Sequence, residues 1–205
     1  MKSKCLLISL PIVAVALMLA ANATAIPIEY VANLSGPNES PSNDSPGTGF
    51  ADVTFDLDAH TMRVQVTFSG LIGTTTASHI HSPTAVPFTG KAGVATQVPF
   101  FDGFPIGVTS GTYDMTFDTS LDSTYNPDFV TANGGSVDAA EAALAASLAA
   151  GTAYLNIHST VFPGGEIRGF LHVPEGFSTA WAALPFAVLL LAAGVRKSRR
   201  KLLRR

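Results

Sequence analysis

This chain of 205 residues has a single cysteine and few basic side chains between its two ends. Its single cysteine, Cys5, stands near the amino terminus ahead of an apolar run, so the remainder of the chain forms no disulfide and offers no thiol nucleophile. Between the two ends, only three basic side chains stand among all 15 acidic ones, which gives this part a net charge of −12. Because phosphate binding needs a basic surface, we do not expect nucleic acid as a partner.

Motifs of the common enzyme classes are also missing. The sequence has no Gly-x-Ser-x-Gly element, no phosphate-binding glycine loop and no His-Glu-x-x-His pair. No recognisable pattern therefore pairs a nucleophile with an adjacent base. These absences predict a protein without enzymatic activity.

The first 25 residues have the parts of a secretory signal peptide. Lys2 and Lys4 precede an apolar run over residues 6–20, and Ala23-Thr24-Ala25 follows as a small-residue cleavage site. The alternative is a retained anchor, although the run is short for a spanning helix. We therefore expect an exported protein whose mature chain begins near Ile26.

A second apolar segment lies near the carboxyl terminus. Residues 180–195 carry no charge, and residues 177–179 can lengthen the segment toward the roughly 17–25 residues that a transmembrane helix needs. The ten residues that follow hold seven positive charges, which places this end in the cytoplasm and the bulk of the protein outside. The pattern predicts a C-terminal transmembrane helix that anchors the protein in the membrane.

Alternation of apolar and polar residues dominates residues 26–172. Residues 53–57 and 62–68 alternate on both sides of a short connection, which predicts an antiparallel hairpin. Further strands are expected near residues 28–34, 76–81, 111–117, 154–158 and 167–173. One helix is expected between Ser136 and Gly151. The predicted fold class is all-β, an antiparallel β-sandwich of immunoglobulin-like or superoxide-dismutase-like type with one short docked helix.

Three of the five histidines stand at the spacing of residues that share one face of a strand. His79 and His81 form one such pair, and His158 shares a face with Asn156 on another predicted strand. If the two strands are neighbours, the three imidazoles converge, and such a ligand set suits zinc or copper. The alternative is structural: the histidines hydrogen-bond to the backbone and to one another, and no cofactor is bound.

Glu166 and Arg168 follow a Pro-Gly-Gly turn and are also two residues apart. We expect them to form a charge pair that orders the turn, whose glycines permit a positive φ. A catalytic role for the pair is the less favoured alternative.

Three stretches resemble the CHRD domain, which is named for repeats in chordin and also occurs in many exported bacterial proteins. They are residues 34–41, residues 70–81 and residues 154–169. The last stretch holds the residues identified as the structural signature of the family, which are Asn156, Gly164, Gly165, Glu166 and Arg168. The resemblance predicts one CHRD domain over residues 26–172, and it implies an extracellular β-sandwich with no settled enzymatic activity.

The carboxyl-terminal part, residues 173–205, resembles a PEP-CTERM sorting signal. Val173, Pro174 and Glu175 precede the apolar segment and the basic tail, although Gly176 stands where the type pattern has proline. The resemblance implies an exosortase-like sorting enzyme as a partner and cleavage near residues 174–176. Together with the signal peptide, it is typical of a Gram-negative bacterium.

These observations predict an exported protein of the cell envelope or extracellular matrix with a structural, adhesion or ligand-binding role. Its expected partner is an exopolysaccharide or a surface protein. The alternative is a copper- or zinc-binding domain, or a superoxide-dismutase-like redox domain, that uses His79, His81 and His158. A third interpretation, a polysaccharide-binding module, would use the aromatic side chains of Phe100, Phe101, Phe104, Tyr113 and Tyr125.

Overall fold

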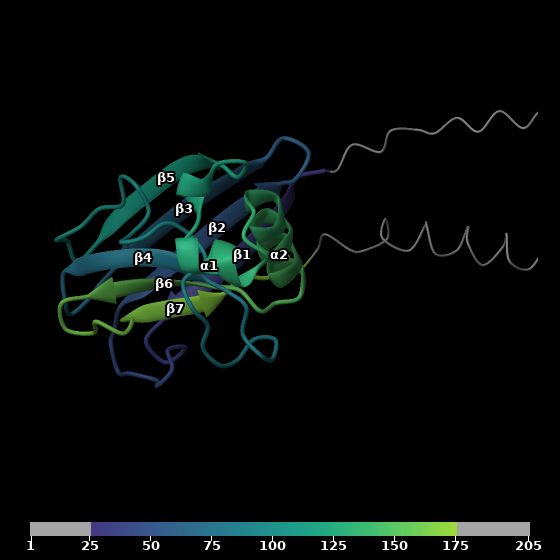
Figure 1. The fold of residues 1–205 in the computed structure, drawn as a ribbon. Coiled ribbons are helices and arrows are strands. Elements are labelled where there is room, and N and C mark those ends of the chain that lie inside the picture. Colours follow the sequence, from purple (N-terminus) through teal and green to yellow (C-terminus); the bar gives the residue numbers. More distant parts are fainter. Residues whose placement is uncertain (1–25, 176–205) are drawn as a thin grey trace, which may run out of the picture.

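Seven antiparallel strands form one curled sheet in the computed structural model, which describes residues 26–175 (Figure 1). The strands are β1 (Ile28–Ser35), β2 (Thr48–Asp56), β3 (Thr61–Ser69), β4 (Thr75–His81), β5 (Gly111–Asp118), β6 (Tyr154–Ser159) and β7 (Ile167–Phe170). Their spatial order is β4-β6-β7-β1-β2-β3-β5. The prediction of a mainly antiparallel β fold is confirmed. The described strands belong to one hydrogen-bonded sheet that curls around its core, where two separate sheets were expected.

The predicted hairpin is the pair β2 and β3. In its register, Val53 lies opposite Val64 and Phe55 lies opposite Met62, and all four side chains are buried. The period of two turns their neighbours, such as Arg63, to the other face. Burying each such apolar side chain stabilises the fold by about 1.5–3 kcal/mol, so this alternation accounts for much of the core.

The predicted helix is α2 (Val137–Ala149). The Ser136 hydroxyl accepts a hydrogen bond from an N–H of the first turn, and Gly151, with φ +66°, follows the end of the helix. Leu144 and Leu148 point into the hydrophobic core, which docks the helix on the sheet. The helix therefore begins and ends where the sequence predicts.

A second short helix, α1 (Pro127–Ala132), was not predicted. It follows a 3-10 turn, η1 (Asp122–Thr124). Asn126 caps α1 by accepting a hydrogen bond from the Asp128 N–H, and Pro127 occupies the first helical position. This cap-and-proline pattern is a helix-start signal that the sequence does carry.

The long connection between β4 and β5 covers the outer edge of β4. The Ala95 N–H donates to the Ile80 carbonyl over 2.9 Å, and the Gly107 N–H donates to the Thr75 carbonyl over 2.9 Å. An uncovered strand edge would present unpaired backbone groups to other chains. The same loop carries backbone carbonyls across β4, next to the side chains of its outer face.

Both predicted sorting segments lie largely outside the described residues. The signal peptide (residues 1–25) and the apolar segment with its basic tail (residues 176–205) are not described. Between residues 26 and 175, none of the helices is long and apolar enough to cross a membrane. Val173, Pro174 and Glu175 come directly after the sheet, and the first and last of these are exposed.

Candidate metal centre

Strands β4 and β6 bring the three predicted histidines together. The two strands pair in antiparallel register, with His79 opposite Asn156 and His158 opposite Ala77. The ring centroids of His79 lie 5.7 Å from His81 and 5.3 Å from His158, and those of His81 and His158 are 5.8 Å apart. One ring nitrogen from each residue lies within 4.8 Å of the other two. The expected convergence of the imidazoles is therefore present.

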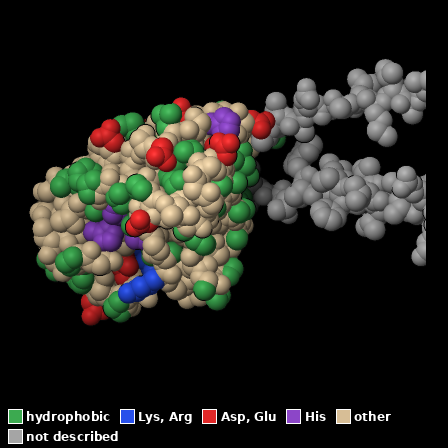
Figure 2. Space-filling model, in the orientation of Figure 1, with side chains coloured by type: hydrophobic (Ala, Val, Ile, Leu, Met, Phe, Trp, Pro, Cys, Tyr) green, Lys and Arg blue, Asp and Glu red, His purple; other side chains and the backbone are tan. Residues whose placement is uncertain are grey.

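The opposite face of these strands is apolar. Ile80 of β4 and Leu155 and Ile157 of β6 are wholly buried in the core. Strand alternation then turns the histidines outward, under the loops. Figure 2 shows histidine side chains that reach the surface on this side of the molecule. His79 and His81 are buried, whereas His158 is partly exposed.

Each ring is held by one backbone carbonyl. His79 Nε2 lies 2.7 Å from the Pro99 carbonyl, His81 Nδ1 lies 3.0 Å from the Ala92 carbonyl, and His158 Nδ1 lies 2.8 Å from the Pro163 carbonyl. A carbonyl only accepts, so each of these nitrogens carries the proton. The other nitrogen of a neutral ring is then an unprotonated lone pair.

These lone pairs belong to His79 Nδ1, His81 Nε2 and His158 Nε2. All three atoms are buried and lack a hydrogen-bond partner. The structural alternative is thus met in part: the rings do hydrogen-bond to the backbone, but within the described chain no hydrogen bond joins one ring to another.

Burial keeps the three rings neutral at pH 7. It lowers the pKa of His79 and His81 to about 4, and the carbonyl hydrogen bonds only partly oppose this effect. Burial also lowers the pKa of His158. Because metals bind the unprotonated imidazole, the site needs to release few protons to accept a cation.

A stack of side chains adjoins the cluster. The Tyr154 ring lies parallel to His81, with centroids 4.9 Å apart, and the Arg168 guanidinium covers Tyr154 at 4.7 Å. Arg168 also donates to the carbonyls of Asn38 (2.5 Å) and Gly90 (2.9 Å). This signature arginine therefore ties β7 to two loops.

The predicted pair of Glu166 and Arg168 is wrong. The Arg168 Nε lies 3.8 Å from Glu39 Oε2, and both of these side chains are buried. Glu166 precedes β7, so strand alternation does not direct its side chain toward Arg168. Glu39 stands in the stretch that resembles the opening of the CHRD domain, but no pattern in the sequence marks it as a site residue.

The Glu166 carboxylate is instead buried among hydrogen-bond donors. It accepts from the Ser45 hydroxyl (2.6 Å) and from the N–H groups of Ile72 (2.5 Å) and Gly73 (3.2 Å). Burial alone would raise the pKa of Glu166, but the hydrogen bonds outweigh it and lower that pKa. This side chain joins three segments of the fold, which fits its place in the structural signature.

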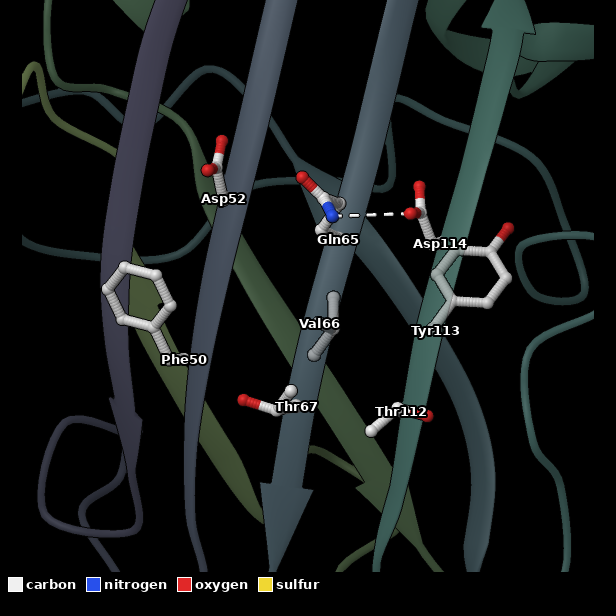
Figure 3. A pocket seen from close by; sticks show the side chains of 8 residues that line it. All are labelled: Phe50, Asp52, Gln65, Val66, Thr67, Thr112, Tyr113 and Asp114. Carbon is white, nitrogen blue, oxygen red and sulfur yellow. Dashed lines mark hydrogen bonds between the residues drawn. The ribbon is translucent and has the colours of Figure 1, made fainter.

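Most of the aromatic side chains proposed for polysaccharide binding belong to the core. Phe101, Phe104, Tyr113 and Tyr125 are buried, and Phe100 packs against the same core. A groove does cross the outer face of β2, β3 and β5, where Phe50 stands beside polar side chains (Figure 3). The predicted set of aromatics does not form an exposed stacking surface.

Comparison with known proteins gives one match. The family model described as the CHRD domain matches residues 30–171. No curated protein and no solved structure matches the chain.

Proposed function

The chain belongs to the CHRD domain family, and we propose that it is an exported protein that binds one zinc or copper ion through His79, His81 and His158. Membership is consistent with a non-enzymatic extracellular or periplasmic domain. Metal binding adds a definite ligand to the structural or adhesive role expected of a protein of the cell envelope or extracellular matrix.

The observation that carries this proposal is the set of three buried lone pairs without a donor. Leaving a buried acceptor unpaired costs about 1–3 kcal/mol. Each of the three unpaired nitrogens carries this free-energy cost. A single cation bound by all three removes the cost at each of them. Hydrogen bonds from the opposite ring nitrogens to carbonyls are the usual outer support of a metal-bound histidine.

The dimensions also suit a transition metal. Zinc–nitrogen bonds of about 2.0–2.1 Å place tetrahedral ligands roughly 3.3 Å apart. The three nitrogens lie within 4.8 Å of one another, so small inward rotations of the rings close the site. Three imidazoles suit zinc and copper better than magnesium or calcium, which prefer oxygen.

We infer that this metal-binding domain reaches the cell surface through both sorting segments. Residues 1–25 act as the signal peptide, residues 26–172 form the domain, and residues 173–205 form the sorting signal. An exosortase-like enzyme cuts near Pro174 and replaces the membrane helix with the final attachment, which places the domain beside exopolysaccharide or other surface proteins. The exposure of Val173 and Glu175 directly after the sheet supports access of such an enzyme.

Elemental analysis tests the metal proposal. The full-length protein is purified without chelators and then stripped and titrated with zinc and with copper. We expect one equivalent per chain, and we expect His79→Ala, His81→Ala and His158→Ala each to abolish tight binding. His60→Ala and His172→Ala remove histidines outside the cluster and should retain the metal. A wild-type protein that takes up no zinc or copper, or an unchanged affinity in the three cluster variants, contradicts the proposal.

A further inference from the structure

We propose that the side-chain oxygen of Asn156 is the fourth ligand of this metal ion, so that the centre is a closed site of three histidines and one asparagine that holds zinc. This inference rests on the metal site proposed above. It gives a chemical role to a residue that the sequence marks only as part of the structural signature.

The first observation is where the unpaired buried atoms lie. Among the described residues, six buried side-chain atoms have no hydrogen-bond partner, and four of them are His79 Nδ1, His81 Nε2, His158 Nε2 and Asn156 Oδ1. These four residues share the outer face of the β4–β6 pair. Unpaired buried acceptors are rare in folded proteins, so this concentration on one face requires an explanation.

The second observation is the position of Asn156 within that face. It stands two residues before His158 on β6 and directly opposite His79 on β4. Side chains in such positions have Cβ atoms about 4.5–5.5 Å apart.

The third observation is that the Asn156 amide has a fixed orientation. Its Nδ2 donates to Glu39 Oε1 over 3.1 Å, and Glu39 is itself paired with Arg168. A carboxylate accepts and does not donate, so the nitrogen of the amide must face Glu39. Asn156 Oδ1 is therefore turned away from Glu39 and cannot gain a partner by rotation of the amide.

Four hydrogen-bond acceptors without a donor indicate that the site binds a cation. A positive ion satisfies all four lone pairs at once, whereas a water molecule can donate to only two of them. Four protein ligands are typical of structural zinc sites, and catalytic zinc sites keep one position open. A closed centre ties β4 to β6 and leaves no position for a substrate, in keeping with a non-enzymatic domain.

Zinc and cobalt titrations of the full-length protein test the role of Asn156. Asn156→Leu has nearly the same size but no oxygen, and we expect its zinc affinity to fall by at least about tenfold, the lower end of the loss for groups that support a metal. The visible bands of bound cobalt should weaken as solvent enters the open position. Asn33→Leu, at an exposed position of β1, serves as the matched control and should leave both readings unchanged.

A double variant that exchanges the amide and the carboxylate between positions 156 and 39 tests whether Asn156 is a metal ligand or only a structural residue. In the double variant Glu39→Gln and Asn156→Asp, the amide and the carboxylate change places, and the hydrogen bond between them is retained. The carboxylate now faces the metal, so we expect zinc affinity at or above the wild-type value and a shifted cobalt spectrum. A purely structural role predicts no change in the cobalt bands, whatever the loss of the Glu39 charge beside Arg168 does to stability.

The outcomes separate this inference from the proposal on which it rests. If wild-type protein binds neither zinc nor cobalt, the metal site itself is wrong. If it binds both and a folded Asn156→Leu variant binds them equally well with the same spectrum, only the ligand role of Asn156 is wrong. If that variant does not fold, a crystal structure of the wild-type zinc form decides: Asn156 Oδ1 bound to the metal supports the inference, and a water molecule in the fourth position overturns it.

Discussion

Gly165 leaves the space that the Asn156 amide occupies. A Cβ atom at Gly165 would overlap both Asn156 Nδ2 and Glu39 Oε1, and the residue has a φ of +127° that other residues rarely adopt. Gly164, its neighbour in the same turn, faces open space. Packing therefore requires glycine at position 165 but not at position 164.

This difference predicts unequal effects of alanine at the two positions. Gly165→Ala should lower the free energy of unfolding by about 2 kcal/mol or more, because it adds backbone strain and a steric overlap. It should also weaken zinc binding, because it displaces Asn156. Urea unfolding and zinc titration measure the two effects, and Gly164→Ala is the matched control. Equal losses in both variants would show that the overlap at Gly165 does not matter.

Removal of Glu39 should destabilise the fold through the partner it leaves behind. Glu39→Ala leaves the buried Arg168 without its acidic partner and removes the hydrogen-bond acceptor of the Asn156 amide. Loss of one member of a buried pair costs about 3–5 kcal/mol. The exposed pair of Arg63 and Asp114, 2.6 Å apart, offers the comparison, and Asp114→Ala should cost at most about 1 kcal/mol. Urea denaturation measures the loss of unfolding free energy in both variants. A smaller loss for Glu39→Ala than for Asp114→Ala would contradict the prediction.

Acid should destabilise the metal-free protein. In the folded state the pKa of His79 and of His81 is about 4, below the unfolded value of about 6.5. Between these values the unfolded chain binds more protons, so the free energy of unfolding falls as the pH falls from about 6.5 to about 4. We expect a loss on the order of 3 kcal/mol for each of the two rings, measured by urea unfolding in the presence of a chelator.

The control for this experiment replaces the two histidines. A variant with His79→Gln and His81→Gln lacks two of the three buried rings and keeps only His158, so its unfolding free energy should vary less over the same pH range. A wild-type protein whose stability stays flat between pH 7 and pH 4 would show that these rings are not held neutral.

The contact between His60 and Glu141 should have the opposite pH dependence. His60 Nδ1 lies 2.9 Å from Glu141 Oε2 and joins the β2–β3 turn to α2. The hydrogen bond to Glu141 raises the pKa of His60, so its contribution to stability is fully present below the unfolded value of about 6.5 and is lost as the pH rises through the folded value. The stability difference between wild type and His60→Gln should therefore be larger at pH 6 than at pH 9.

The same variant is informative about the metal. His60 is outside the cluster, so His60→Gln should bind zinc as wild type does. A pH-independent stability difference would mean that the contact with Glu141 does not depend on the charge of His60.

Processing of the carboxyl terminus can be read from the mass of the mature protein. If the sorting signal is used, the chain recovered from the envelope or matrix should end near residues 174–176 and lack the apolar segment. Substitution of Val173, Pro174 and Glu175 by alanine should leave the full-length chain in the membrane. A mature wild-type protein that still ends at Arg205 would show that the segment is a retained anchor.

The sequence was sufficient for the parts of the fold that depend on local alternation. Val53 and Val64 lie where the period of two predicts, and the convergence of His79, His81 and His158 followed from the same rule once β4 and β6 were neighbours. That adjacency depends on contacts between distant segments. The curl of the single sheet depends on them too, so spacing along the chain does not reveal either feature.

Other features of the site depend on side-chain surroundings that no motif records. The spacing of Glu166 and Arg168 predicts a pair, yet each finds closer partners on loops more than 90 residues earlier in the chain. Which nitrogen of each imidazole stays free is decided by backbone carbonyls of two loops, the β4–β5 connection and the β6–β7 connection. The unpaired oxygen of Asn156 follows from the position of Glu39, which the histidine pattern does not include.

The three carbonyls that hold the imidazoles also reduce the ordering that binding of an ion would require. Pro99, Ala92 and Pro163 hold the rings before any ion arrives, so their rotamers need little further ordering on binding. Preorganisation of this kind reduces the entropic cost of association. Under the proposed function, the exported domain therefore takes up its metal ion without a large rearrangement of the three rings.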